Sequence, residues 1–204
     1  MNPEISCPIC KSIEIEFQDH YTHDNEIFKG MTRQKCFSCD LHFAYPMPLE
    51  SSLNKYNISY HQSAHGGQER NLKLQGFFSG ISRTRLNLIN QSIKLDSKKN
   101  YTVLEIGPGP GAFASIWLEQ FPKTKYFAIE TDVSCHEVLQ NMNITILEEN
   151  KIKNHTDSFD IIIISHVLEH VTNPIKFLDP IIANLKNGGF MYIEVPCNDW
   201  KHKK

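Results

Sequence analysis

Three glycines recur at alternate positions directly after an apolar stretch. Residues 103–106, which are apolar except for Glu105, are followed by Gly107, Gly109 and Gly111, and Ala112 opens a run with helical apolar spacing. Glycine has no side chain, so its backbone can approach a ligand closely, and the first amides of a helix can hold an acceptor group. This pattern predicts a strand, a turn and a helix that together bind a nucleotide-like cofactor.

Two carboxylates accompany this loop. Glu105 lies two residues before Gly107, where it would favour an amine-bearing ligand and repel a pyrophosphate. Glu130 ends the next predicted strand, 23 residues after Gly107, where a carboxylate can accept hydrogen bonds from ribose hydroxyls. The glycines at positions 107 and 109 with Ala112 also satisfy the dinucleotide motif G-x-G-x-x-A, so a nicotinamide cofactor is the alternative.

Four cysteines form two C-x2-C pairs, Cys7 with Cys10 and Cys36 with Cys39, separated by 25 residues. Four thiolates on two tight turns make a closed tetrahedral site that suits Zn²⁺. Redox chemistry would need the strand-helix context of thioredoxin-type motifs, which the pattern here does not offer. We therefore predict a small β-rich zinc ribbon in which the metal is structural.

Histidines follow the most apolar run of the chain. Four isoleucines precede Ser165, and His166-Val167-Leu168-Glu169-His170 comes next. A histidine there has a suitable intrinsic pKa for removing a proton from a hydroxyl or amine acceptor, so His166 and His170 are the candidate bases. The same letters spell the H-x-x-E-H zinc motif, but that motif needs a helix, and the isoleucines predict a strand end. A divalent ion held by Glu169 and His170 stays open as an alternative.

From about residue 100 the chain alternates between strand and helix patterns. Strands are predicted over 102–106, 125–130, 143–147, 159–165 and 190–195, and helices over 112–121, 134–142 and 174–185. Alternation of this kind predicts an α/β fold with a Rossmann-like, mostly parallel sheet and flanking helices. The carboxyl ends of its strands should bring the glycine loop, the acids and the histidines to one edge of the sheet.

In combination, these motifs resemble the class I S-adenosylmethionine-dependent methyltransferases. The resemblance rests on 105–111, on Glu130 and on the block 159–171, and it covers about residues 80–196. A cysteine-rich ribbon before such a domain also resembles the bacterial sugar and surface-polysaccharide methyltransferases. The resemblance implies S-adenosylmethionine as cofactor and a small-molecule methyl acceptor, such as a sugar or a nucleotide-linked sugar.

The same resemblance implies a set of cofactor-binding residues: Glu105, Gly107, Gly109, Gly111, Glu130, Glu148, Ser165 and His166. The glycines would line the methionine moiety, Glu105 would lie near its amino group, and Glu130 would hold the ribose. Glu148 stands where such enzymes often bind the adenine amino group, although their usual Gly-Asp-Ala is absent there. Ser165 and His166 would flank the cofactor at the end of the fourth strand.

Composition divides the chain into three parts. Residues 1–48 form the predicted zinc ribbon, 49–99 a basic helical linker and 100–204 the cofactor-binding core. Residues 51–100 carry eight Lys and Arg against two Asp and Glu, whereas 1–50 carry four against eight. No stretch is apolar enough to span a membrane and the start lacks a signal-peptide pattern, so we expect a cytoplasmic protein without a membrane partner.

The family fold continues beyond its fifth strand with a helix and two further strands, whereas this sequence ends at Lys204. We therefore expect a core truncated after strand five, with an exposed edge that favours a homodimer. Three alternatives stay open: a ribosomal RNA methyltransferase that holds RNA with the ribbon and the basic helix, a non-catalytic cofactor-binding or interaction protein, and a nicotinamide-dependent oxidoreductase. The acidic ribbon argues against phosphate contacts, so we expect no nucleic-acid partner.

Overall fold

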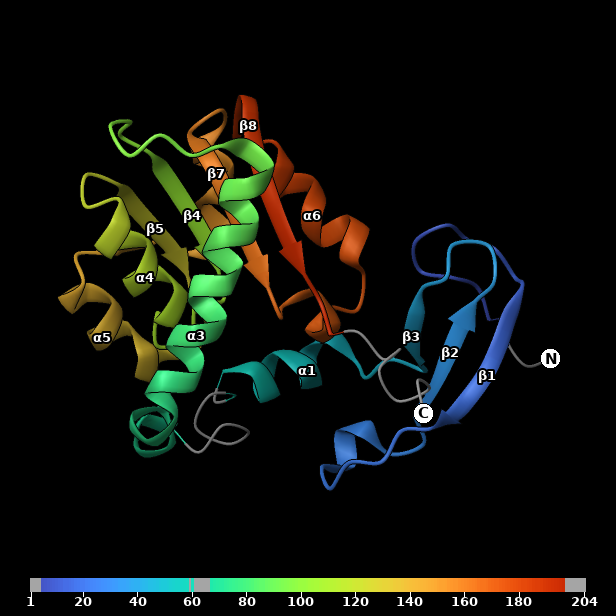
Figure 1. The fold of residues 1–204 in the computed structure, drawn as a ribbon. Helices are drawn as coiled ribbons and strands as arrows, with labels where there is room; N and C mark the ends of the chain where they lie inside the picture. Colours follow the sequence, from blue (N-terminus) through green and yellow to red (C-terminus); the bar gives the residue numbers. More distant parts are fainter. Residues whose placement is uncertain (1–4, 59, 61–66, 197–204) are drawn as a thin grey trace.

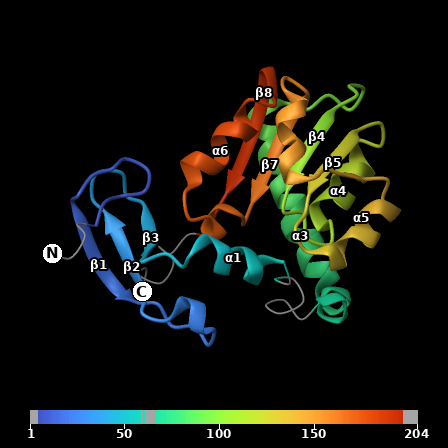
Figure 2. The same ribbon diagram turned by 180° about the vertical axis from the view of Figure 1, so that it is seen from behind.

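The computed structural model describes residues 5–58, 60 and 67–196. In this part of the chain the strands form two separate sheets, one of three strands and one of five. The smaller sheet stands to one side of the larger body, and helix α1 (Glu50–Asn57) lies between them (Figure 1, Figure 2). None of the helices in the described part combines the length and the apolar character that a membrane crossing needs.

The smaller sheet is an antiparallel meander. Its strands are β1 (Ile15–His20), β2 (Thr32–Cys36) and β3 (His42–Tyr45), in that order. A short 3-10 helix (Glu26–Phe28) lies in the long β1–β2 connection. Within the described residues the buried apolar side chains of this module are those of Cys7, Met31 and Cys36. So small a core would gain stability from a metal cross-link.

The larger sheet is parallel throughout and has the order β6-β5-β4-β7-β8. Its strands are β4 (Thr102–Ile106), β5 (Lys125–Ile129), β6 (Thr145–Ile146), β7 (Phe159–Ser165) and β8 (Leu185–Glu194). Their carboxyl ends share one edge, which faces α1 (Figure 1). The strand order reverses between β4 and β7, and such a switch point is where open α/β sheets bind ligands. The predicted Rossmann-like fold is confirmed.

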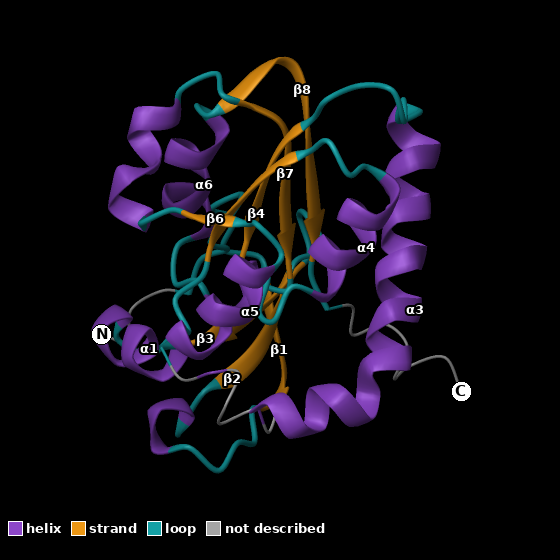
Figure 3. Cartoon of the chain, turned by 90° about the vertical axis from the view of Figure 1, so that its left-hand side faces the viewer, coloured by secondary structure: helices purple, strands orange, loops and turns teal. Residues whose placement is uncertain are grey.

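Helices cover both faces of this sheet (Figure 3). One face carries α3 (Gly67–Ile93), α4 (Ala112–Gln120) and α5 (His136–Asn141), and the other carries α6 (Pro174–Ile182) with the 3-10 helix Glu149–His155. The isoleucines of β7 alternate between the two layers, because successive side chains of a strand point to opposite faces. Ile161 and Ile163 pack with α3 and α4, whereas Ile162 and Ile164 pack with α6.

The predicted elements are present, with local differences at their ends. The predicted helix 134–142 is divided into a 3-10 turn (Val133–Cys135), capped by Asp132, and α5. The last strand begins at Leu185 and not at 190, because residues 186–189 bulge out between two paired positions. The predicted truncation after strand five concerns 197–204, which lie outside the described residues.

Candidate active site

The glycine loop joins the carboxyl end of β4 to the first turn of α4. Gly107, Gly109 and Gly111 all have positive φ values, of 67°, 55° and 78°, a conformation that residues with side chains rarely adopt. Gly111 is the N-cap residue of α4. The loop therefore presents the first amides of the helix at the edge of the sheet where ligands bind.

The three glycines differ in the space that surrounds them. A Cβ atom at Gly107 would lie 2.8 Å from Cγ2 of Val167, and one at Gly111 would collide with Met142 and with Leu139. A Cβ atom at Gly109 would meet no other atom within 4 Å. A side chain at the first or third glycine would therefore displace a neighbouring side chain. Gly109 instead borders open space, as a cradle for a cofactor requires.

Glu130 contacts the loop from the neighbouring strand. One carboxylate oxygen accepts a hydrogen bond of 2.8 Å from the amide of Gly109, and the other accepts one of 2.8 Å from the amide of Asp132. The predicted ribose-binding acid and the predicted loop are thus brought together. Each carboxylate oxygen has a second lone pair that can accept a hydrogen bond from a ligand hydroxyl.

Glu105 is buried at the end of β4, with 4% of its surface exposed. Its carboxylate accepts a hydrogen bond of 2.7 Å from the hydroxyl of Tyr126 on β5. Burial raises the pKa of Glu105 to about 7, in spite of the opposing effects of the Tyr126 hydrogen bond and of nearby Arg85. A cationic ligand group beside this carboxyl would favour its charged form.

Glu148 lies beyond the carboxyl end of β6, at the same edge of the sheet as Glu130. Its side chain is 63% exposed and forms an ion pair of 2.6 Å with Lys151. Its assignment to the adenine amino group stays a prediction. Lys151 belongs to the following 3-10 helix and not to the glycine loop.

A further carboxylate, which the sequence did not indicate, lies at the end of β8. Glu194 accepts hydrogen bonds of 2.5 Å from Arg85, 3.1 Å from Ser165 and 3.2 Å from Tyr192. The side chain of Arg85 is 10% exposed and that of Glu194 is 28% exposed, so this ion pair between α3 and the sheet is partly buried. Tyr192 and Glu194 are two positions apart on the last strand and therefore point to the same face. This alternation could have indicated Glu194 as a site residue. Arg85 lies 109 residues away in sequence and gave no such indication.

The two candidate bases have opposite environments. His166 has a φ of 55°, and its ring lies between two carboxylates, with Nδ1 3.3 Å from Glu169 and Nε2 3.4 Å from Glu194. The hydrogen bond with Glu169 raises the pKa of His166. His170 packs against the ring of Tyr60, with 4.6 Å between the centroids, and burial lowers its pKa. His170 is therefore the histidine that favours the neutral form.

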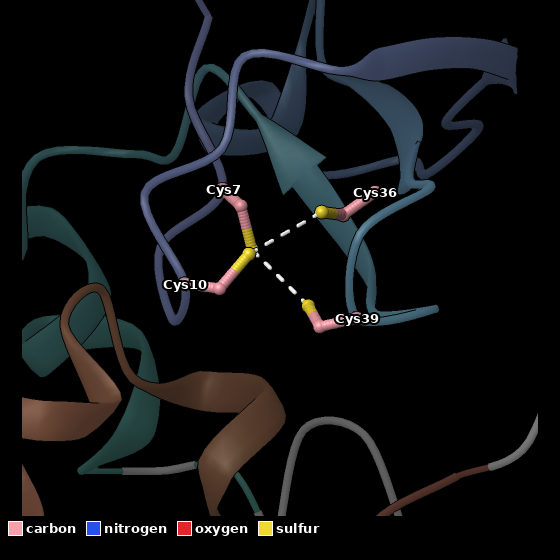
Figure 4. A group of neighbouring side chains, drawn as sticks. All are labelled: Cys7, Cys10, Cys36 and Cys39. Atoms are coloured by element: carbon pink, nitrogen blue, oxygen red, sulfur yellow. Dashed lines mark hydrogen bonds between the residues drawn. The ribbon is translucent and has the colours of Figure 1, made fainter.

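The four cysteines converge at one end of the meander (Figure 4). The sulfur atoms of Cys7 and Cys39 are 3.6 Å apart, those of Cys10 and Cys36 are 3.5 Å apart, and all four lie within 4.8 Å of one another. Zn–S bonds of about 2.3 Å in a tetrahedral site place the sulfur atoms roughly 3.8 Å apart. The donor set and its spacing therefore fit a zinc ion.

The H-x-x-E-H motif does not assemble in the same way. Among the described residues, the cysteines are the one group of three or more His, Cys, Asp or Glu side chains that converge closely enough for a metal ion. His166 follows a strand, and Leu168–His170 form a 3-10 turn. The strand context predicted for this motif is confirmed, and no metal centre is assigned to it.

The strand order, the glycine loop after β4 and the acid after β5 define the class of protein. These features are those of a Rossmann-like methyltransferase domain. The chain belongs to the family described as "Methyltransferase domain", which matches residues 78–204. This match favours S-adenosylmethionine over the nicotinamide alternative.

Among curated proteins, the chain is similar to the ribosomal RNA small subunit methyltransferase A of Mycoplasma mycoides subsp. mycoides SC. The two are 33% identical over 126 residues, which are 56% of this chain and 47% of that protein. The chain therefore spans about half the length of this curated relative.

Two solved structures show the same fold. The plantazolicin methyltransferase BpumL, in complex with a monoazolic desmethylPZN analog and SAH, gives a TM-score of 0.53 at 16% identity, over 74% of this chain and 63% of that one. A SAM dependent methyltransferase from Archaeoglobus fulgidus gives a TM-score of 0.50 at 16% identity, over 70% and 59%. At these identities the likeness concerns the fold and not the acceptor.

Proposed function

We propose that this chain transfers a methyl group from S-adenosylmethionine to a hydroxylated small molecule, such as a sugar or a nucleotide-linked sugar. The observation that carries the proposal is the open space beside Gly109, whose amide is hydrogen-bonded to Glu130. When bound, S-adenosylmethionine supplies an electrophilic methyl group on a sulfonium centre. The protein must then align the acceptor with that group, and alignment accounts for much of the rate of such a displacement.

The proposed cofactor-binding residues follow the carboxyl ends of the strands. The glycine loop would line the methionine part, Glu105 would face the ammonium group, and Glu130 would accept hydrogen bonds from the ribose. Because the ammonium group is positive, its binding would favour the charged form of Glu105, whose pKa burial otherwise raises. Glu148 would accept a hydrogen bond from the adenine amino group, and Ser165 and His166 would flank the cofactor.

We assign removal of the acceptor proton to His170 and a positioning role to His166. A base must be neutral before it accepts a proton, and burial beside Tyr60 lowers the pKa of His170. Both ring nitrogens of His166 face carboxylates, which favour its protonated form. The acceptor oxygen would form the new bond to the methyl carbon as the carbon–sulfur bond breaks, and its proton would pass to a ring nitrogen of His170.

We further propose a structural Zn²⁺ bound by Cys7, Cys10, Cys36 and Cys39. The sulfur separations of 3.5 Å and 3.6 Å support it, as does the small apolar core of the module. Four thiolates leave no open coordination position for a substrate. The metal would therefore stabilise the meander and take no part in the transfer step.

Methyl transfer from tritium-labelled S-adenosylmethionine to a panel of nucleoside-diphosphate sugars tests the proposed function. We expect label in at least one sugar product with the wild-type chain. Gly109→Val should give no label, because its side chain would fill the space beside the loop. Absence of label from every sugar, with cofactor bound, would contradict a small sugar as the acceptor.

A ribosomal RNA acceptor is the second candidate, favoured by the 33% identity with a ribosomal RNA methyltransferase. Three of the basic residues predicted to hold RNA are engaged in ion pairs. The pairs are Arg83 with Glu119 at 3.0 Å, Arg85 with Glu194 at 2.5 Å, and Lys99 with Asp160 at 3.2 Å. These pairs leave less positive charge for phosphates. Small-subunit ribosomal RNA in the same assay discriminates the two acceptors.

A further inference from the structure

A continuous series of aromatic rings connects the cysteine module to the end of β7. We call it the aromatic bridge, and its members are Tyr21, His23, Phe28, Tyr56, Tyr60 and His170. Phe28 of the module lies 5.2 Å from Tyr56, measured between ring centroids. Tyr56 lies 5.6 Å from Tyr60, and Tyr60 lies 4.6 Å from His170. The module therefore reaches the proposed base through rings alone.

The bridge ends among charged groups of the proposed active site. Burial raises the pKa of Tyr60, and the negative charge of Glu169 raises it further. The Tyr60 hydroxyl therefore lies in the electrostatic field of the Glu169 carboxylate. The hydroxyl of Tyr60, the carboxylate of Glu169 and the imidazole of His170 thus share one neighbourhood.

Packing of the module against the core does not by itself require these residue types. Five of the six rings in the bridge belong to Tyr or His and carry a polar atom. Tyr21 is 36% exposed, and Tyr56 and Tyr60 are half-buried. Aromatic side chains with a polar end are typical of surfaces that are apolar on one side and wet on the other. Such a surface is suited to a ligand that is itself apolar on one face and polar at its edge.

A sugar ring has this character. Its C–H face packs on an aromatic ring, and its hydroxyls can donate hydrogen bonds to the carboxylate of Glu169 or exchange them with phenol groups. Residues 1–50 carry eight Asp and Glu against four Lys and Arg, so the polyanionic backbone of a nucleic acid would be repelled on this side. The surface therefore matches a neutral, hydroxylated ring better than a nucleic acid.

On the basis of the proposed function, we infer that Tyr21, Tyr56 and Tyr60 form the acceptor subsite and hold a neutral sugar ring beside His170. The cysteine module then belongs to the active site, because it supplies Tyr21 and positions Phe28 against Tyr56. Loss of the module would impair acceptor binding and leave the cofactor site intact. Cofactor binding would then depend on the larger sheet, and acceptor binding would depend in part on the module that contains the smaller sheet.

Saturation-transfer difference NMR on the full chain, with S-adenosylhomocysteine bound, tests the subsite. The probes are the methyl glycosides of glucose, galactose and rhamnose, and adenosine monophosphate. Saturation should reach the ring protons of at least one glycoside. Tyr60→Phe keeps the ring contact with His170 and removes only the hydroxyl, whereas Tyr56→Leu removes a ring. Each variant should lower the apparent affinity for the glycoside at least fivefold.

Phe17→Leu is the matched control, since Phe17 is an exposed aromatic residue of the same module and contacts His20 outside the bridge. It should bind the glycoside as the wild type does. Three results would overturn the inference: no saturation of any glycoside, equal affinity for the glycoside in wild type and Tyr60→Phe, or saturation of adenosine monophosphate alone.

Calorimetric titration of S-adenosylhomocysteine on the same samples distinguishes a failure of the acceptor subsite from a failure of the proposed function. If it binds and no glycoside does, only the subsite is wrong, and if it does not bind, the proposed function fails.

Discussion

The carboxyl group of Glu105 is buried at the end of β4, where water cannot stabilise its charge. Burial raises its pKa to about 7 in the folded protein, from an ordinary value of 4.5. Between these values the folded protein holds a proton that the unfolded chain has released. A rise in pH through this window therefore favours the unfolded chain.

The free energy of unfolding of the ligand-free protein should accordingly fall as the pH rises from 4.5 to about 7, by up to roughly 3 kcal/mol from this group. Glu105→Gln has the same shape and can still accept the hydrogen bond from Tyr126, so it should remove this part of the slope. Urea unfolding of both proteins across the window measures the difference. Parallel curves for the two proteins would show that Glu105 is charged in the folded state.

The pH dependence of methyl transfer distinguishes the two histidines. If His170 is the base, the rate should decline below pH 6.5, because its pKa is lowered from that value by burial. If His166 were the base, the decline would begin above pH 6.5. His170→Gln should also lower kcat by about a hundredfold while the affinity for S-adenosylhomocysteine stays unchanged. A full rate in His170→Gln would remove this residue from the mechanism.

The sequence indicated both histidines but not their difference. Their intrinsic chemistry is the same, and the contrast arises from neighbours that the fold brings together. Glu194 reaches His166 from β8, and Tyr60 reaches His170 from the segment before α3. Such contacts join residues that are distant in sequence, so no local pattern specifies them.

Between β4 and α4, the three glycines of the loop offer matched substitutions. Gly109→Ala should lower the free energy of unfolding by only about 1–2 kcal/mol, for the positive φ alone, since its methyl group meets open space. That methyl group should lower the affinity for S-adenosylhomocysteine at least tenfold. Gly111→Ala also forces a methyl group against Met142 and Leu139, which should cost a further ~1–3 kcal/mol. Urea unfolding and calorimetry measure both effects, and wild-type affinity in Gly109→Ala would place the cofactor elsewhere.

The elements of the core follow closely from the periodicity of the sequence. The four isoleucines of β7 are buried on both faces, as a continuous apolar run in a parallel sheet predicts. The bulge at 186–189 was not predicted. Glycines such as Gly188 and Gly189 are equally typical of a turn between two elements and of a bulge within one strand. Residues on both sides of the bulge pair with β7, and this pairing makes 185–194 one strand. Because the pairing joins residues that are distant in sequence, no local pattern specifies it.

For the molecule as a whole, the division into a zinc ribbon, a linker and a core stays a prediction that zinc removal can test. Cys36→Ser should abolish bound zinc and unfold the meander, because the module has few buried apolar side chains of its own. The core should still bind S-adenosylhomocysteine with wild-type affinity. Zinc analysis and calorimetry on the same protein measure the two properties, and loss of both together would contradict the division.

The homodimer that the sequence predicts also concerns the whole molecule. In the described part of the chain, β8 is the last strand of its sheet and pairs with β7 alone. An unpaired edge favours association, so the dimer stays a prediction that sedimentation analysis tests. The cytoplasmic location likewise stays a prediction.

Calorimetric titration of the zinc-loaded chain with S-adenosylmethionine, S-adenosylhomocysteine and NAD tests the central claim most directly. We expect the first two to bind with dissociation constants in about the micromolar range, NAD not to bind, and Gly109→Val to bind none of them. Binding of NAD alone, or of no ligand by the wild-type chain, would contradict the assignment of the glycine loop as a site for S-adenosylmethionine.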